Sequence, residues 1–258
     1  MTDFPHIFDD RLRRVRRARA AAGFDAFAFL ADAVAAELSG RLDAMGRDFE
    51  SAVCTGARAP LSGRNGRIVR GDAERSFVGD AGVVFEEERL PFVDRAFDLY
   101  ASVLTLHAVN DLPGALLQIR RCLKPGGLFV AGLFGGETLR ELRESLAQAE
   151  IEIDGGLSPR VAPFADVRDA GGLLQRAGFE EPVADVDTMT VAYEHPFKLF
   201  ADLRGMGETN ALAERRRSPL KRAVVARACE IYFGRFRRAD GRVPATFQIL
   251  YMTGRVSR

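Results

Sequence analysis

The chain has 258 residues, 47% of them hydrophobic and 28% charged, which is an ordinary globular composition with enough apolar material for a sizeable core. Its 37 basic and 36 acidic side chains leave a formal net charge of +1, so no global field favours nucleic acid or an anionic membrane. No apolar run reaches about 18 residues, so we expect no membrane span. The start of the chain lacks a basic segment followed by an apolar one, and the three cysteines form no CxxC pair. These features predict a cytoplasmic protein with reduced thiols.

An arginine-rich helix is the first predicted element, over residues 9–20, where six Arg and two Asp leave a local charge of +4. Its arginines either contact an anionic partner or substrate group, or form a solvated helix face. Residues 26–38 follow with helical spacing of Phe29, Leu30, Val34 and Leu38, which predicts an amphipathic helix on the main domain. Residues 1–45 are therefore expected to form an N-terminal helical arm.

From residue 46 to residue 258 we expect one α/β domain. The predicted strands of its first half are residues 52–55, 67–70, 82–85, 97–103 and 128–133, and a helix with Leu116 and Ile119 on one face precedes the last of them. Pro125, Gly126 and Gly127 are predicted to stop that helix. Strands that alternate with helices indicate parallel βαβ units in a doubly wound sheet.

The second half supplies two more helices, over residues 138–150 and 167–179, and two more strands, over 186–193 and 245–253. The last strand is predicted to be antiparallel. Between these strands lies an insertion, about residues 195–243, with helices expected near 196–204 and 219–236. An insertion of this size is typical of a lid or a partner surface, so we expect a helical cap before the last strand.

Several stretches carry a resemblance. The motifs LPF (90–92), FDL (97–99) and LKPGG (123–127) resemble the central part of class I S-adenosylmethionine (SAM) dependent methyltransferases. The arm, residues 158–179, residues 202–217 and residues 240–254 are similar to the bacterial relatives of the mitochondrial complex I assembly factor with a methyltransferase fold, and in turn to the malonyl-acyl carrier protein methyltransferase. The resemblance implies a seven-stranded Rossmann-like sheet, SAM as cofactor, a small-molecule or carrier-protein substrate, and a respiratory-complex subunit as a further partner.

The same resemblance assigns cofactor contacts at the carboxyl ends of the strands. Asp72 matches the acid that bonds the ribose hydroxyls, Glu86 with Glu87 matches the acid beside the adenine, and Leu106 and His107 fall at the methionine end. Each has an ordinary alternative. Asp72 would then be a turn aspartate, the glutamates would be a solvated loop, and His107 would be a structural histidine rather than a general base.

The first loop departs from the family pattern of an acid followed by Gly-x-Gly-x-Gly. Cys54 stands in place of the acid, Gly56 is the one glycine kept, and Arg58 and Pro60 replace the second and third glycines. Glycines there let the backbone approach a ligand closely. Arg58 either holds the cofactor's carboxylate or fills the methionine pocket and blocks binding.

Three functions follow from these observations. The first is SAM-dependent methyl transfer, and the second is a non-catalytic assembly or binding factor with little or no SAM binding. The third, protein arginine hydroxylation by family resemblance, needs a metal or another redox cofactor, and the spacing of His6, His107 and His195 predicts no metal site. Methyl transfer requires a nucleoside-sized crevice at the carboxyl ends of the first two strands, and we expect one there.

Overall fold

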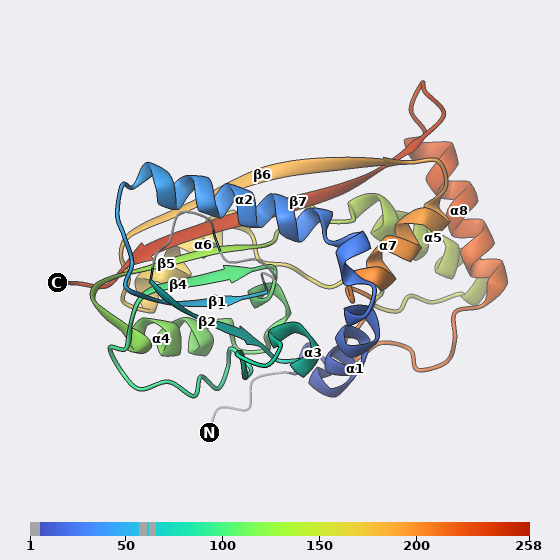
Figure 1. Cartoon of the computed structure of the whole chain (residues 1–258). Helices are drawn as coiled ribbons and strands as arrows, with labels where there is room; N and C mark the ends of the chain where they lie inside the picture. Colours follow the sequence, from blue (N-terminus) through green and yellow to red (C-terminus); the bar gives the residue numbers. More distant parts are fainter. Residues whose placement is uncertain (1–5, 57–60, 62–65) are drawn as a thin grey trace.

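A seven-stranded sheet organises the chain in the computed structural model, which describes residues 6–56, 61 and 66–258 (Figure 1). The strand order is β3-β2-β1-β4-β5-β7-β6. Strands β1 to β5 are parallel to one another, and β7 is antiparallel to both β5 and β6. Their bounds are β1 Ser51–Thr55, β2 Arg67–Asp72, β3 Val83–Val84, β4 Phe97–Val103, β5 Leu123–Phe134, β6 Glu180–Tyr193 and β7 Val243–Arg255. The doubly wound sheet and the antiparallel last strand are confirmed.

Helices cover both faces of this sheet. The bounds are α1 Asp10–Ala21, α2 Phe29–Ala44, α3 Arg75–Val78, α4 Leu112–Cys122, α5 Arg140–Asp154, α6 Val167–Arg176, α7 Pro196–Gly205 and α8 Arg222–Phe236. Val34 and Leu38 of α2 pack in one apolar cluster, and Ile119 of α4 with Leu174 of α6 packs in a second. The strands alternate between the two clusters, with Val53 pointing to one and Cys54 to the other. Burial on both faces is typical of parallel strands under crossover helices.

Strands β5 and β6 begin well before their predicted starts. Strand β6 begins at Glu180, six residues earlier than expected, because Val183 and its neighbours pair with the end of β7. That pairing is a tertiary contact between distant segments, so local periodicity carries no sign of it. Strand β5 begins at Leu123, directly after α4 ends at Cys122, and Gly126 has the positive φ of +73° that this turn-like start requires.

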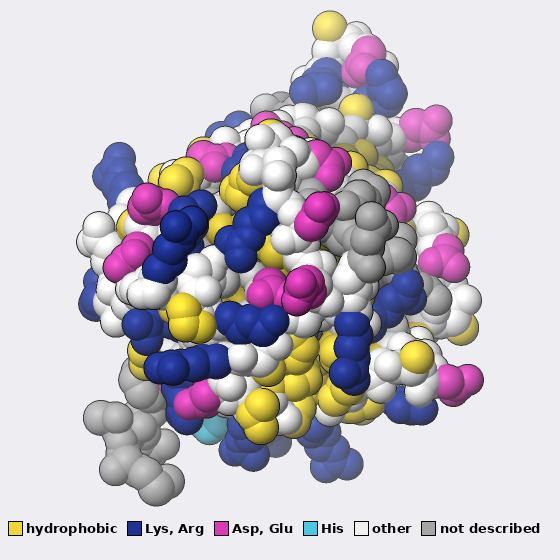
Figure 2. Space-filling view, turned by 60° about the vertical axis from the view of Figure 1, so that its left-hand side comes forward, with side chains coloured by type: hydrophobic (Ala, Val, Ile, Leu, Met, Phe, Trp, Pro, Cys, Tyr) yellow, Lys and Arg dark blue, Asp and Glu magenta, His cyan; other side chains and the backbone are white. Residues whose placement is uncertain are grey.

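The surface agrees with the nearly neutral charge. On the face shown in Figure 2, basic and acidic side chains are interspersed, and hydrophobic side chains show between them. Among the described residues no helix is both long enough and apolar enough to cross a membrane. The thiols of Cys54, Cys122 and Cys229 are buried, and among the described residues they form no disulfide. The division into arm, main domain and cap stays a prediction.

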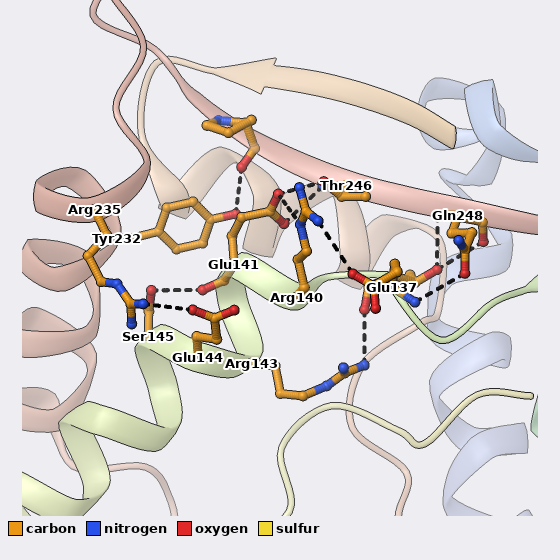
Figure 3. A network of polar contacts seen from close by, with 12 residues as sticks. Glu137, Arg140, Glu141, Arg143, Glu144, Ser145, Tyr232, Arg235, Thr246 and Gln248 are labelled. Carbon is orange, nitrogen blue, oxygen red and sulfur yellow. Dashed lines mark hydrogen bonds and ion pairs between the residues drawn. The ribbon is translucent and has the colours of Figure 1, made fainter. Parts of the chain in front are cut away.

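A buried carboxylate fixes α5 against β7. Glu141 is 2% exposed, and its two oxygens accept hydrogen bonds from the backbone N–H of Thr246 at 3.1 Å and from the Thr246 hydroxyl at 2.5 Å (Figure 3). The hydroxyl of Tyr232, on α8, donates to the carbonyl of Pro244 at 2.8 Å. Helices α5 and α8 are thereby held at the start of β7.

Replacing Glu141 by alanine should lower the free energy of unfolding by about 2–4 kcal/mol, because two buried donors of Thr246 lose their acceptor. The control is Glu144→Gln on the same helix, where the ion pair with Arg235 is exposed to solvent. That change should cost no more than about 0.5 kcal/mol. Urea unfolding measures both values. Equal small losses for the two variants would contradict the role of Glu141.

Candidate functional site

The predicted cofactor residues gather at the carboxyl ends of β1, β2 and β4. Asp72, Glu87 and His107 line one small cavity there, and Gly56 lines a second beside it. Leu106 is buried in the apolar cluster that contains α4, so the structure places it in the core and not against these cavities. Arg58 and Pro60 lie outside the described residues.

Gly56 is required by the packing of the protein itself. Its φ is +75°, and a Cβ at this position would lie 1.9 Å from the carbonyl oxygen of Val103 and 2.7 Å from the Thr105 methyl group. No side chain can replace it without moving the end of β4. Here the glycine permits a close approach between two strand ends, in addition to any ligand contact that the resemblance implies.

Arg17 of α1 forms a buried ion pair with Asp72. The guanidinium donates to the two carboxylate oxygens at 2.6 Å and 3.3 Å, and the two residues are 9% and 4% exposed. Burial alone would lower the pKa of Arg17, but the charge and the hydrogen bonds of Asp72 outweigh it and raise that pKa. The guanidinium also lies over the ring of Phe77, 4.3 Å from its centroid.

Asp72 also serves as an ordinary turn aspartate, because its Oδ1 accepts the backbone N–H of Glu74 at 2.9 Å. Its carboxylate therefore has one local partner, Glu74, and one long-range partner, Arg17. The carboxylate is fully engaged in this arrangement.

A second arginine of the same helix reaches the other predicted cofactor acid. Arg14 contacts Glu86 at 3.0 Å, at a more exposed place, while Glu87 is buried. The expectation of a solvated helix face is wrong for Arg17, and the expectation of a solvated acidic loop is wrong for Glu87. The anionic groups that α1 contacts include carboxylates of its own chain.

Within the described residues, helix α1 occupies the place of the expected nucleoside-sized crevice. The cavity beside Asp72 and the cavity beside Gly56 measure about 20 Å³ each, and Arg17 lines both. Such a volume holds about one water molecule, whereas cofactor pockets measure roughly 300–1,000 Å³. The charge pattern of residues 9–20 gave no sign of which carboxylates its arginines pair with, so this arrangement was not predicted.

His107 forms a pair with a residue of the predicted cap. Its Nε2 lies 3.2 Å from a carboxylate oxygen of Glu208, and its ring packs on Phe134 and Phe164. Burial raises the pKa of Glu208, but His107, Arg17 and Arg13 together outweigh burial and hold that pKa below its usual range. In the described part of the chain the buried Nδ1 of His107 has no hydrogen-bond partner.

Sequence reasoning missed Glu208. The available signal was its place in the glycine-rich, polar run of residues 205–210 in the middle of the cap. That run indicates a functional loop, but it does not indicate that the loop folds back onto the end of β4.

The arm and this loop are joined by backbone pairing. Phe8 forms an antiparallel bridge with Leu212, and the N–H of Asp9 donates to the carbonyl of Ala211 at 2.8 Å. The N–H of Ala213 donates to the carbonyl of Ile7 at 2.9 Å. Helix α1 and the segment that carries Glu208 are therefore connected at the start of the helix.

A much larger cavity, about 660 Å³, opens on the other side of His107. Its walls are mainly apolar and come from α5, α7 and residues 161–164; they include Leu139, Leu142, Leu146, Val161, Phe164, Phe197, Phe200 and Leu203. Arg13, Arg160, Arg204 and Glu208 supply charged groups. Its volume lies in the range in which proteins bury small ligands.

No group of three or more His, Cys, Asp or Glu side chains is arranged to hold a metal ion within residues 6–56, 61 and 66–258. The charged groups of the site are carboxylates, guanidinium groups and one imidazole.

Comparison with known proteins gives three kinds of match. A family model described as a methyltransferase domain matches residues 31–131. Arginine-hydroxylase NDUFAF5, mitochondrial, from Mus musculus is 40% identical over 96% of this chain and 77% of its own. Malonyl-(acyl-carrier protein) O-methyltransferase from Halorhodospira halophila is 38% identical over 63% of this chain and 53% of its own, so the match spans about half of that relative.

Among solved structures, phospholethanolamine N-methyltransferase 2 from Haemonchus contortus, in complex with phosphomonomethylethanolamine and S-adenosylhomocysteine, has a TM-score of 0.54. The match covers 95% of this chain and 60% of that one at 13% identity. At this identity the match concerns the fold alone, and it agrees with the Rossmann-like sheet described above.

A double-mutant cycle tests the ion pair at the centre of the site. Arg17→Met and Asp72→Asn should each lower the free energy of unfolding by about 3–5 kcal/mol, because each leaves a buried charge without its partner. The double variant should lose at least about 2 kcal/mol less than the sum of the two losses. Chemical denaturation gives all four values. Additive losses would contradict a direct interaction.

Proposed function

This chain belongs to the class I SAM-dependent methyltransferase superfamily, among the relatives of NDUFAF5 and malonyl-acyl carrier protein O-methyltransferase, and from that membership we propose that it transfers a methyl group from SAM to a small-molecule, carrier-bound or protein acceptor. It is a SAM-dependent methyltransferase-like protein. The family membership does not favour the alternative of a non-catalytic assembly factor. The observation that carries the proposal is the buried carboxylate of Asp72 at the end of β2, beside His107 and next to a large cavity.

The carboxylates at the edge of the sheet suit a nucleoside in their chemistry, because they accept hydrogen bonds. The Asp72 carboxylate is an acceptor for ribose hydroxyls, and Glu86 and Glu87 are acceptors for the adenine amino group. The cavity beside Asp72 is too small for a nucleoside while Arg17 remains paired with Asp72. Cofactor binding therefore requires that the ribose replace Arg17 as the partner of Asp72. When bound, SAM supplies the electrophilic methyl group.

The chain's own residues would orient the acceptor and exclude water from it. The large cavity ends at His107, which also lines the small cavity beside Asp72, so an acceptor there would lie next to the cofactor position. Holding the two reactants in line is the main contribution such an enzyme makes. Where the acceptor's nucleophile carries a proton, His107 is the group placed to receive it, and Glu208 fixes its ring.

The finer assignments belong to the same proposal. A small molecule or a carrier protein is the substrate that the malonyl-acyl carrier protein relative suggests, and a respiratory-complex subunit is the protein partner implied by the resemblance to the assembly factor. A cytoplasmic location is supported by three buried thiols that form no disulfide among the described residues.

Calorimetric titration with SAM and S-adenosylhomocysteine tests the proposal directly. The chain should bind one equivalent of either ligand, and Asp72→Asn should weaken binding at least tenfold because the ribose loses its acceptor. Arg17→Met should tighten binding at least tenfold, because it removes the side chain that competes with the ribose for Asp72. Circular dichroism verifies that this variant is folded. Asp80→Asn, an exposed aspartate before β3, is the control and should change nothing.

Failure to bind at millimolar ligand would contradict the proposal. Equal affinities for the chain, Asp72→Asn and Asp80→Asn would show that the ribose site is elsewhere. Weaker binding by Arg17→Met would show that Arg17 contributes to the site instead of occupying it.

A second candidate function is hydroxylation of an arginine side chain, favoured by the 40% identity with the mouse relative of that name. The Glu208 carboxylate on the wall of the large cavity is an acceptor for a guanidinium group. The reaction inserts one oxygen atom of dioxygen into a C–H bond, and a two-electron donor with two protons reduces the other atom to water.

Mass spectrometry of an arginine peptide incubated with the chain, dioxygen, a reductant and a redox-active metal salt should then show a gain of one oxygen atom. Glu208→Gln should abolish this gain, and Glu214→Gln, an exposed residue of the same segment, should not. An unmodified peptide under all these conditions would contradict this candidate.

A further inference from the structure

The large cavity carries an inference about its ligand. We propose that it binds a single-chain amphipathic anion, an aliphatic carboxylate whose chain lies between α5 and α7 and whose carboxylate contacts Arg13. The inference bears on the proposed function, because the acceptor would enter this same cavity, but it concerns binding alone and needs no cofactor.

The walls suit a flexible hydrocarbon chain. Leu142 and Leu146 lie one turn apart on α5 and face Phe200 and Leu203 of α7 across the cavity. Phe197, at the rim, is 56% exposed although it is a large aromatic side chain. Exposed apolar surface that continues into a cavity of about 660 Å³ is typical of a binding site for an apolar ligand.

The charges of the lining leave an excess of positive groups. The guanidinium of Arg160 is neutralised by the buried carboxylate of Glu150, with the Nε of Arg160 at 2.8 Å from it. Glu208 contacts His107 at 3.2 Å. Arg13 and Arg204 make no ion pair within the part of the chain that the structure describes, and against Glu208 they leave one more cation than anions in the lining. This excess of positive charge favours an anionic ligand over a neutral or cationic one.

Arg13 is the better of these two contacts for the carboxylate. It is half-buried and lines both the large cavity and the cavity beside Asp72, whereas Arg204 is exposed at the end of α7. An Nη1–H of Arg13 donates to the carbonyl of Ala108, but the buried Nε–H has no acceptor among the described residues. A carboxylate can accept two parallel hydrogen bonds from a guanidinium group. These hydrogen bonds are stronger where water is excluded.

Calorimetric titration with alkanoates from about six to about twelve carbons tests the chain. Affinity should rise roughly fourfold for each added methylene group, as burial of one CH₂ predicts, until the cavity is filled. Decyltrimethylammonium, with the charge reversed, should bind at least tenfold more weakly than decanoate. The same affinity for all chain lengths, or tighter binding of the ammonium ion, would overturn the proposal.

Two pairs of variants place the ligand. Ala201→Trp fills the cavity from an exposed position of α7 and should abolish decanoate binding, whereas Lys198→Trp, also exposed on α7 but outside the cavity, should not. Arg13→Gln should weaken decanoate binding at least tenfold and leave 1-decanol binding nearly unchanged, whereas Arg204→Gln should weaken decanoate by less than about threefold, as expected for an exposed charge.

Binding that survives Ala201→Trp, or that depends on Arg204 and not on Arg13, would overturn the proposed position. Thermal unfolding of each variant without ligand shows that the fold is retained. Because no cofactor is present, a chain that binds SAM but no alkanoate contradicts this inference alone, and one that binds alkanoate but no SAM contradicts only the proposed function.

Discussion

The ion pair between Arg17 and Asp72 is the interaction on which the rest of the site depends. It joins the second helical turn of the arm to the end of β2, and both partners are almost fully buried. Breaking it by removal of one partner is costly, because the other charge remains without water or a counter-ion. A ligand whose hydroxyl groups take the place of the guanidinium meets a smaller cost, since the carboxylate then keeps hydrogen bonds. The pair therefore restricts the edge of the sheet to ligands that can replace it.

The site has two parts, and His107 lies between them. On one side are the carboxylates of Asp72 and Glu87 with little free volume, and on the other is the large cavity between α5 and α7. Helix α5 can form a wall of this cavity because Glu141 holds it to β7, while Leu142 and Leu146 on the same helix point to the cavity. The polar side of α5 thus gives rigidity, and its apolar side gives a surface for a ligand.

Much of the fold could be predicted from the sequence, because buried parallel strands and amphipathic helices leave periodic apolar patterns. Strand β4 has the predicted bounds, and both cap helices lie close to their expected positions. The start of β6 and the partners of Arg17 could not be predicted, because they depend on contacts between segments far apart in the chain. The resemblance indicated Asp72 and His107 as residues near one another at the sheet edge. It did not indicate Glu208, whose position depends on how the cap folds back onto β4.

The backbone pairing of Phe8 with Leu212 connects the start of α1 to the segment that carries Glu208. Helix α1 leads from this pairing to Arg17, so a displacement of the helix that frees Asp72 would also shift a wall of the large cavity. The affinities of the two halves of the site are then thermodynamically linked, and each ligand changes the dissociation constant of the other by the same factor. A ligand bound on one side of His107 would in this way change the fraction of chains that hold a ligand on the other side. Which ligand binds first would depend on the concentrations of the two.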